Sequence, residues 1–462
     1  MELILRDHHG QLTVNNSRQN SARPYRNLAN YEEEKHLWQV LESGLDFEIC
    51  CQEFALACFL GNYKLVELYL NYYFKRTWHC FKEKSQTLYK LLNHYNEYGN
   101  TPLILAIRGW NDHPLEYDLC SLLIKHGVDL NITQQLSKES PLMTAIKLGS
   151  NQIVQVLLDN DADTTLCDNV GISPLYAAIL HNNETAVKAL IETGCDINMG
   201  SQDHTSLFIA TRLGHLNIVK MLCEAGCDIS KTNKYGFSHV YEAALRGHNH
   251  VLSYLLQHGG NPNVTDIYGN SPLHAAAVKG HVTCIKLLIE GGVSLKLRNH
   301  NRECALSVAL LAGKAEVVEH LLEAGLEVIP ASEDKQVSVG NIVTVLERGM
   351  SSTIAVLIRG CSYLPMLHCI TMLPGLRKNT TLIKLLVHSG IQTVPAILLA
   401  TEKQYGSNQL PDWLVQMKSN ARSLQDCCRI QIRKCLQNKV LFKTKQLPLP
   451  TDLKMFITLK TI

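Results

Sequence analysis

Cysteine and histidine are the side chains in this sequence best suited to metal binding or nucleophilic chemistry. The chain contains 16 cysteines and 20 histidines. A structural zinc site draws its ligands from closely spaced cysteine or histidine pairs. The closest cysteines are Cys223 with Cys227 and the adjacent pairs at 50–51 and 427–428, and this arrangement lacks the spacing of a zinc site. These residue types therefore predict no metal centre.

Signatures of catalysis are also missing from the sequence. It contains no glycine-rich phosphate loop, no HExxH motif and no GxSxG nucleophile turn. The histidines are dispersed, and several of them, including His215, His248 and His281, follow a glycine at a repeated position, as structural turn residues do. Cys223 and Cys284 lie within apolar helical patterns and are expected to be small core residues. We expect a non-catalytic chain that needs no cofactor.

Length and charge narrow the class of protein. The chain has 462 residues, of which 46% are hydrophobic. This length exceeds what one compact core usually supports, but it suits a stack of repeats in which each unit packs only on its neighbours. With 44 basic and 42 acidic residues, the sequence gives no reason to expect binding to nucleic acid or to a membrane. No apolar run approaches the roughly 18 residues of a membrane span, and residues 1–30 are polar, unlike a secretory leader. We expect an intracellular protein with reduced thiols, located in the cytoplasm and also in the nucleus.

A period of 33 residues organises the middle of the chain. The residue that opens each helical pair recurs with spacings of 33, 32, 33, 33 and 33 residues, at Leu142, Leu175, Leu207, Val240, Leu273 and Leu306. The best copy, residues 268–281 (YGNSPLHAAAVKGH), resembles the Thr-Pro-Leu-His-x-Ala core of the ankyrin repeat. In this copy we expect Gly269 to permit a hairpin turn, Ser271 and Pro272 to begin the first helix, and Gly280 and Gly291 to end the two helices.

The resemblance implies an all-α fold: an ankyrin-repeat solenoid of helix pairs with short β-turn hairpins, followed by a helical C-terminal domain. Degenerate copies at both ends extend the array to roughly ten units of ~33 residues. The expected divisions are a polar tail with a short helix (1–48), the repeat array (49–399, regular between 101 and 327), a connector (400–420) and a C-terminal domain (421–462).

Residues 423–436 (SLQDCCRIQIRKCL) have the pattern of an amphipathic helix. At about 100° per residue, Leu424, Cys428 and Ile432 fall on one side, with the arginines on the other. Such a stripe alone would also suit the closing helix of the repeat array. However, a hydroxyl residue, Leu, three residues, Cys, three residues and an aliphatic residue together resemble the elongin C-binding box of a SOCS box. This resemblance implies that Leu424, Cys428 and Ile432 contact elongin C.

A proline-rich segment follows this helix. Two prolines flanking a leucine remove backbone donors and hold the chain extended, so that the leucines are presented for contact. Alone, LPLP is more often a linker, but after an elongin box it resembles a cullin-5 box at residues 446–457. The cullin contacts implied by this resemblance are Leu447, Pro448, Leu449, Pro450, Leu453 and Phe456.

Ankyrin repeats followed by these two boxes resemble the ankyrin-repeat and SOCS-box family. The resemblance implies a substrate-recognition subunit of a RING E3 ubiquitin ligase, in which the repeats bind a protein target. The SOCS box would recruit elongins B and C, cullin-5 and a RING partner. The alternative is a non-catalytic ankyrin scaffold or inhibitor, whose box-like tail only caps the last repeat.

Aromatic residues indicate two candidate target-binding regions. Nine of the 30 aromatic residues lie between residues 69 and 98, with basic neighbours, which is the composition of an interface hot spot. The candidates in this region are Tyr73, Trp78 and Phe81; the alternative is a satellite core that covers the N-terminal end of the array. On the concave face of the array, the candidates are the aromatic residues that replace more polar consensus positions, Tyr235, Phe237, Tyr241 and Tyr268.

Overall fold

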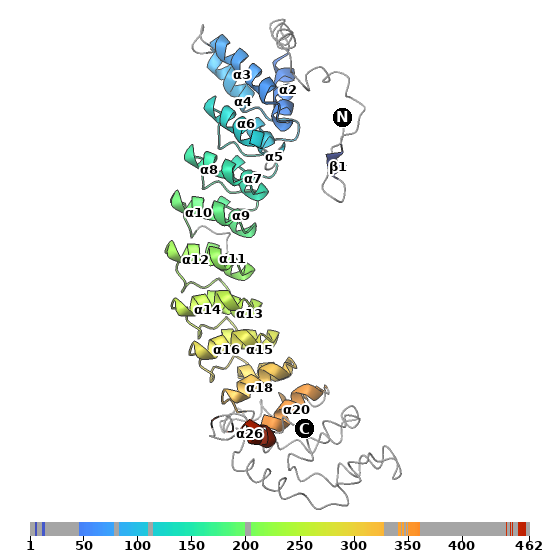
Figure 1. The fold of residues 1–462 in the computed structure, drawn as a ribbon, viewed down its shortest axis with the longest axis vertical. Coiled ribbons are helices and arrows are strands. Elements are labelled where there is room, and N and C mark those ends of the chain that lie inside the picture. The colour runs from blue at the N-terminus through green and yellow to red at the C-terminus, as the bar shows by residue number, and fades with distance from the viewer. Residues whose placement is uncertain are drawn as a thin grey trace, which may run out of the picture. The chain divides into compact units, whose positions relative to one another are not determined.

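The computed structural model describes residues 46–77, 83–109, 114–198, 205–327, 351–360 and 451–458, together with two short strands and isolated positions at 341–350 and 440–446. Within this part of the chain, the dominant element is a pair of helices that recurs along the sequence (Figure 1). The all-α ankyrin architecture predicted from the 33-residue period is therefore confirmed.

Each repeat contributes a first and a second helix. The first helices are α2 (Phe47–Phe59), α5 (Pro102–Gly109), α7 (Pro141–Leu148), α9 (Pro174–Leu180), α11 (Ser206–Leu213), α13 (His239–Arg246), α15 (Pro272–Lys279) and α17 (Ala305–Leu311). The second helices are α3 (Tyr63–Thr77), α6 (Pro114–Lys125), α8 (Asn151–Asp159), α10 (Glu184–Glu192), α12 (Leu216–Glu224), α14 (Asn249–Gln257), α16 (Val282–Glu290) and α18 (Ala315–Glu323). Three further helices are α4 (Glu83–Leu92), α20 (Ser351–Gly360) and α26 (Thr451–Thr458).

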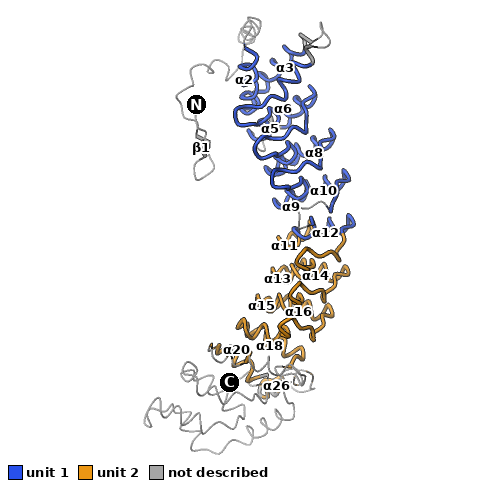
Figure 2. The backbone as a smooth tube through the Cα atoms, turned by 180° about the vertical axis from the view of Figure 1, so that it is seen from behind, with its two compact units in different colours: residues 1–210, 220–227 blue, residues 211–219, 228–462 orange. Residues whose placement is uncertain are grey.

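The chain forms two compact units, one comprising residues 1–210 and 220–227 and the other residues 211–219 and 228–462 (Figure 2). In the first unit, α2, α5, α7 and α9 pack on one another in order, while α6, α8 and α10 form a second row. In the second unit, α13, α15 and α17 form one row and α14, α16, α18 and α20 the other. Each helix pair therefore buries its apolar face on its neighbours, as expected for a repeat stack.

The residues predicted to open the helical pairs form the core of the stack. Each of these side chains has a relative exposure of 2% or less: Leu142, Leu175, Leu207, Val240, Leu273 and Leu306. Their depth explains the 33-residue period, because one large aliphatic side chain per repeat fills the space between successive helix pairs.

Residue types at the helix ends set the repeat boundaries. The Ser140 hydroxyl accepts a hydrogen bond from the N–H of Met143 (3.2 Å), and Pro141 follows as the first helical residue of α7. Gly149 ends the same helix with φ = 83°, a left-handed conformation that glycine adopts without steric cost.

The best copy of the repeat behaves as predicted. Ser271 caps α15, Gly280 ends it with φ = 91°, and Gly269 turns the preceding loop with φ = 78°. Gly291 is the C-cap of α16, also as predicted, although it has φ = −76°, and the left-handed residue is its neighbour Gly292 (φ = 79°).

Other elements lie at the two ends of the chain. Leu5–Arg6 (β1) pairs antiparallel with Leu12–Thr13 (β2). The short helix predicted within the polar tail, at residues 31–41, and the predicted connector at 400–420 lie outside the described residues. Among the described helices, none is both long and apolar enough to cross a bilayer.

Candidate target-binding surface and SOCS box

The loops between repeats are shaped by a side chain at their first position. In the loop that starts at Asn233, its Oδ1 accepts hydrogen bonds from the N–H groups of Tyr235 (3.0 Å) and Phe237 (3.0 Å). Equivalent bonds shape the neighbouring loops, which begin with Asn96, Asp168, Asp266 and Asn299. Each such residue stands three positions before a left-handed residue, which is glycine except at Arg302. This spacing of Asn or Asp three residues before the left-handed residue is visible in the sequence and would have predicted the loops.

Successive loops of the second unit are joined through their backbones. The N–H of Ile267 donates to the carbonyl of Tyr235 (3.1 Å), and the N–H of His300 donates to the carbonyl of Tyr268 (2.9 Å). These bonds fix the backbones from which Tyr235 (45% exposed) and Tyr268 (64% exposed) project. The two predicted tyrosines are therefore exposed aromatic side chains on an ordered frame.

The other two predicted residues in this region lie deeper. The Phe237 ring stacks on Tyr241, with centroids 4.5 Å apart and an angle of 11° between the planes. Tyr241 is 5% exposed, and its hydroxyl donates to Oδ2 of Asp266 (3.0 Å). Burial and then the Asp266 charge raise the pKa of Tyr241 well above its ordinary value. Tyr241 thus supports the surface from below, and Tyr235 and Tyr268 form its exposed part.

A buried histidine supports the same loops. His274 Nδ1 accepts from the Ser271 N–H (3.2 Å), while its Nε2 lies 3.0 Å from the carbonyl oxygen of Glu303 in the next loop. Because a carbonyl can only accept, Nε2 carries the proton and the ring is neutral. Burial lowers the pKa of His274, and burial likewise lowers that of His239, whose Nδ1 lies 2.9 Å from the carbonyl oxygen of Ile229.

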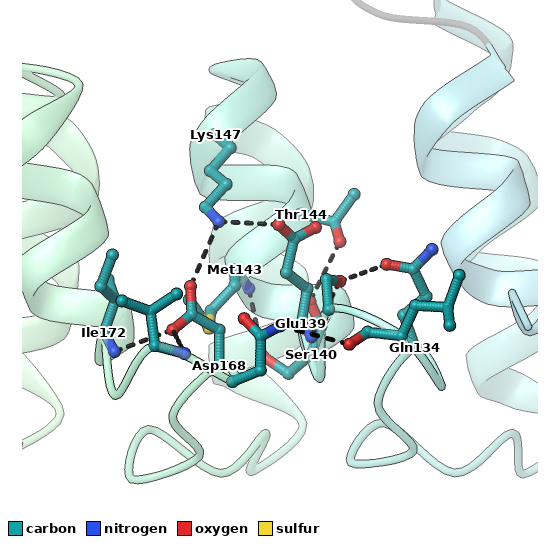
Figure 3. A network of polar contacts seen from close by, with 12 residues as sticks. Gln134, Glu139, Ser140, Met143, Thr144, Lys147, Asp168 and Ile172 are labelled. Carbon is teal, nitrogen blue, oxygen red and sulfur yellow. Dashed lines mark hydrogen bonds and ion pairs between the residues drawn. The ribbon is translucent and has the colours of Figure 1, made fainter.

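Charged side chains link the loops of the first unit. Glu139 binds Lys147 at 2.8 Å, and Lys147 also lies 3.6 Å from Asp168 (Figure 3). Glu139 also binds Arg108, at 3.0 Å. Arg108 additionally donates to Oδ1 of Asn100 (3.0 Å). Two cations are thus matched by two carboxylates, and this network connects three consecutive repeats.

The aromatic segment 69–98 is largely helical. Tyr69 and Tyr72 lie in α3 and are buried, and Tyr73 in the same helix is half-buried, with its ring 6.1 Å from that of Phe47. Helix α4 packs on α3 and α2 through buried leucines. The buried rings fit the alternative of a satellite core that covers the N-terminal end of the array. Of the described aromatic side chains in this segment, three are exposed, namely Phe74, Tyr89 and Tyr98. Trp78 and Phe81 lie outside the described residues.

Three cysteines of the array have weakly acidic thiols. Burial raises the pKa of the Cys195, Cys223 and Cys284 thiols to about 11, so almost none of the reactive thiolate is present at neutral pH. Cys284 is completely buried in α16, and Cys227 is also buried. Cys284 thus agrees with the prediction of a small core residue, whereas Cys223, like Cys195, is only half-buried.

The predicted SOCS box is described only at its end. Leu424, Cys428 and Ile432, like residues 447–450, lie outside the described residues. Helix α26 begins at Thr451, directly after the proline-rich segment, and includes the backbones of Leu453 and Phe456. Its Ile457 side chain is buried, and the Thr458 hydroxyl donates to the carbonyl of Lys454 (2.9 Å).

Family models match both parts of the chain. The model for ankyrin repeats matches three overlapping or adjacent stretches, residues 54–168, 142–233 and 240–330, which together extend over more than half of the chain. The SOCS-box model matches residues 420–458. The chain belongs to the ankyrin-repeat and SOCS-box family. Its relatives include Ankyrin repeat and SOCS box protein 6 of Pongo abelii, which is 30% identical over 99 residues, or 20% of this chain.

Other similar proteins share the repeats. A stretch of 166 residues (36% of this chain) is 29% identical to an ankyrin repeat and KH domain-containing protein of Caenorhabditis briggsae. A stretch of 110 residues (23% of this chain) is 29% identical to a putative ankyrin repeat protein of fowlpox virus. These two stretches span 6% and 31% of the relatives' own lengths, and the Pongo abelii stretch spans 23%.

Two solved structures are similar to the array. The ankyrin repeat domain of Bcl-3 is 27% identical, with a TM-score of 0.43, covering 49% of this chain and 99% of that one. The human ASB11 ankyrin repeat domain is 23% identical, with a TM-score of 0.41. The match covers 52% of the present chain and 98% of the ASB11 domain.

Proposed function

We propose that this protein is the substrate-recognition subunit of an elongin B/C–cullin-5 RING E3 ubiquitin ligase. The observation that carries the proposal is the presence, in one chain, of ankyrin repeats and a C-terminal SOCS box. The repeats bind the target, and the SOCS box recruits the ligase. The chain acts in the cytoplasm and nucleus and performs no chemistry itself.

The proposed mechanism is proximity. Residues 423–436 hold elongin C through Leu424, Cys428 and Ile432, while residues 446–457 contact cullin-5. Holding a target and a ubiquitin carrier in one complex raises the effective concentration of the target lysines near the reactive thioester. The RING partner and its ubiquitin-conjugating enzyme supply the catalysis.

The target surface is proposed to include Tyr235 and Tyr268. Their exposed rings stand on loops that are hydrogen-bonded to one another, so little conformational entropy is lost when a partner binds. Aromatic side chains on rigid backbones are typical interface anchors. The buried Tyr241 holds this surface in place through Asp266.

Affinity purification of the full chain tests the proposal. Mass spectrometry should recover elongins B and C with cullin-5 at near-stoichiometric levels, and replacing Leu424 and Cys428 with Ala should remove them. A chain that purifies without elongins or cullin-5 would instead be an ankyrin scaffold or inhibitor. Target identification requires proximity labelling in cells treated with a proteasome inhibitor, because ubiquitinated targets are otherwise degraded.

A further inference from the structure

The first helices of three consecutive repeats end in the same kind of residue pair. Each pair combines one aliphatic and one basic residue and stands directly before a left-handed glycine, as Arg212–Leu213, Leu245–Arg246 and Val278–Lys279. The basic side chains reach solvent: Arg212 and Arg246 are each 44% exposed, and Lys279 is also exposed. Leu213 and Val278 are exposed beside them. We name these three pairs the basic row.

Positive charge is in excess in the basic row. Arg212 and Arg246 share one carboxylate, that of Glu242, at 3.8 and 3.0 Å, and this carboxylate is itself only 3% exposed. Among the residues that the structure describes, no carboxylate forms an ion pair with Lys279. Lys314 extends the positive charge, because its side chain lies over Gly280 at the end of α15.

The first unit contains basic residues at equivalent helix ends, and there they are neutralised within the chain. There Lys147 stands at the end of α7 and binds Glu139 and Asp168 (Figure 3). Arg108 stands at the end of α5 and binds Glu139. Two cations thus meet two carboxylates. The basic row contains three cations, and two of them, Arg212 and Arg246, pair with the single carboxylate of Glu242. The remaining positive charge faces solvent.

We propose that the basic row binds an extended acidic segment of the protein target. Packed helices lie about 8–10 Å apart, so the backbone positions that carry the cations recur at roughly that interval. In this structure the Arg212 and Arg246 side chains converge on one oxygen of Glu242, and they would have to separate to face successive carboxylates. An extended peptide advances about 3.3 Å per residue, so carboxylates three residues apart match that interval. The intervening residues of the segment would meet Leu213, Leu245 and Val278, which favours aliphatic side chains there. This proposal rests on the receptor function above and specifies the target chemistry.

A synthetic peptide provides a direct probe. Four repeats of Glu-Leu-Thr place a carboxylate at every third residue, and an isomer with the same composition but with its glutamates consecutive is the matched control peptide. Fluorescence anisotropy with the full chain should show saturable binding of the first peptide, at least about tenfold tighter than binding of its isomer. Binding should weaken as salt is raised, because the row is exposed to solvent.

Two charge reversals locate the site. Lys279→Glu should weaken binding of the Glu-Leu-Thr peptide by at least about tenfold, because it puts a like charge opposite the peptide. Lys286→Glu makes the same change of net charge at an exposed position on α16, outside the row, and should leave binding unchanged. Both variants should retain elongins, so loss of peptide binding is distinguishable from failure of the receptor function.

Four outcomes would overturn the proposal. If neither peptide binds, the cations serve only to complement the helix C-termini. If both isomers bind equally, or if Lys279→Glu and Lys286→Glu weaken binding alike, the chain attracts anions without a defined row. The row would be assigned to nucleic acid if a single-stranded oligonucleotide bound more tightly than the Glu-Leu-Thr peptide and if Lys279→Glu weakened that binding.

Discussion

The hydroxyl of Tyr241 donates to Oδ2 of Asp266 over 3.0 Å and thereby couples two consecutive repeats. Asp266 uses its other oxygen to accept from the N–H groups of Tyr268 (2.9 Å) and Asn270 (2.7 Å). A side chain buried in α13 therefore orients the next loop, and with it the exposed ring of Tyr268.

Removing only this hydroxyl should measure the coupling. Tyr241→Phe keeps the ring that stacks on Phe237 but leaves Asp266 without one of its donors. A buried hydrogen bond to a charged group contributes about 1.5–3 kcal/mol, so we expect a loss of about 1.5 kcal/mol in the free energy of unfolding. Urea denaturation followed by circular dichroism checks this value.

Tyr235→Phe is the matched control for that change. The Tyr235 ring is exposed, and its loss of a hydroxyl should alter the free energy of unfolding by less than about 0.5 kcal/mol. Equal effects of the two substitutions would contradict the coupling role of Tyr241.

The regular repeats were predictable because their backbone demands particular residue types. A left-handed turn selects glycine, a helix start selects serine and proline, and the inter-repeat space selects one large aliphatic side chain, as at Leu273. The Tyr241–Asp266 bond was not predictable in this way. It joins residues of different repeats, and a tyrosine in that position has the same sequence signature whether it is buried or exposed.

The burial of the aromatic residues in segment 69–98 could not be predicted from the sequence either. Its composition resembled a binding surface, yet Tyr69 and Tyr72 face the core and Phe74 faces solvent. Which side is buried depends on the helices that pack against α3, and α4 is one of them. Composition alone does not contain that information.

The elongin box gives the second prediction. A buried hot-spot side chain contributes on the order of 2 kcal/mol or more to binding, so replacing Leu424 and Cys428 with Ala should remove most elongin from the purified complex. Leu424→Pro should act more strongly, because proline near the helix start also disturbs the backbone. Copurification measures the result, and an unchanged thermal melt shows that the repeats remain folded.

Arg429→Ala is the control for these substitutions, since Arg429 is expected on the opposite side of the same helix. It should retain elongin. Stoichiometric elongin in the Leu424 and Cys428 variants would rule out the assigned box.

The third prediction separates the two ligase contacts. Replacing Pro448 and Pro450 with Ala should loosen the extended segment and weaken cullin-5 binding, because its ordering entropy must then be lost on binding. Elongin binding should be unaffected. Quantitative immunoprecipitation of both partners checks the division, and simultaneous loss of elongins and cullin-5 would show that the two boxes act as one site.

The fourth prediction concerns pH. Burial lowers the pKa values of His239 and His274 in the folded protein, so the unfolded chain binds these protons more readily. The free energy of unfolding should therefore be highest above the unfolded pKa of about 6.5 and should fall as pH decreases through the lowered folded values. Protonation of His274 would also remove the Nδ1 acceptor used by the Ser271 N–H.

Urea denaturation between pH 8 and pH 5.5 at constant ionic strength measures this slope. Asp266 and Glu303 oppose the lowering of the His274 pKa, and Arg298 reinforces it. The histidine itself must therefore be replaced, with these three charged residues left in place. His274→Gln should flatten the slope, although it also lowers stability at pH 8. His258→Gln changes an exposed ring and should leave the slope intact. A slope that persists after His274→Gln and His239→Gln together would show that other groups control it.

The last prediction distinguishes the two aromatic surfaces as target sites. Deleting residues 76–94 would remove the buried Leu91 and Leu92 and so destabilise the N-terminal end of the array. Substitutions of exposed side chains therefore test the two surfaces better than a deletion does.

One variant carries Tyr235→Ser and Tyr268→Ser, and the other carries Phe74→Ser, Tyr89→Ser and Tyr98→Ser. Each should keep its thermal melt within a few degrees of the unaltered chain, because the rings are exposed. We expect the first variant to lose its proximity-labelled targets and the second to retain them. Tyr235 and Tyr268 stand on loops joined to their neighbours by backbone bonds and lie in the same unit as the basic row, whereas Tyr98 stands on a similarly joined loop in the other unit. The opposite result, with targets lost only from the second variant, would move recognition to the N-terminal aromatic segment.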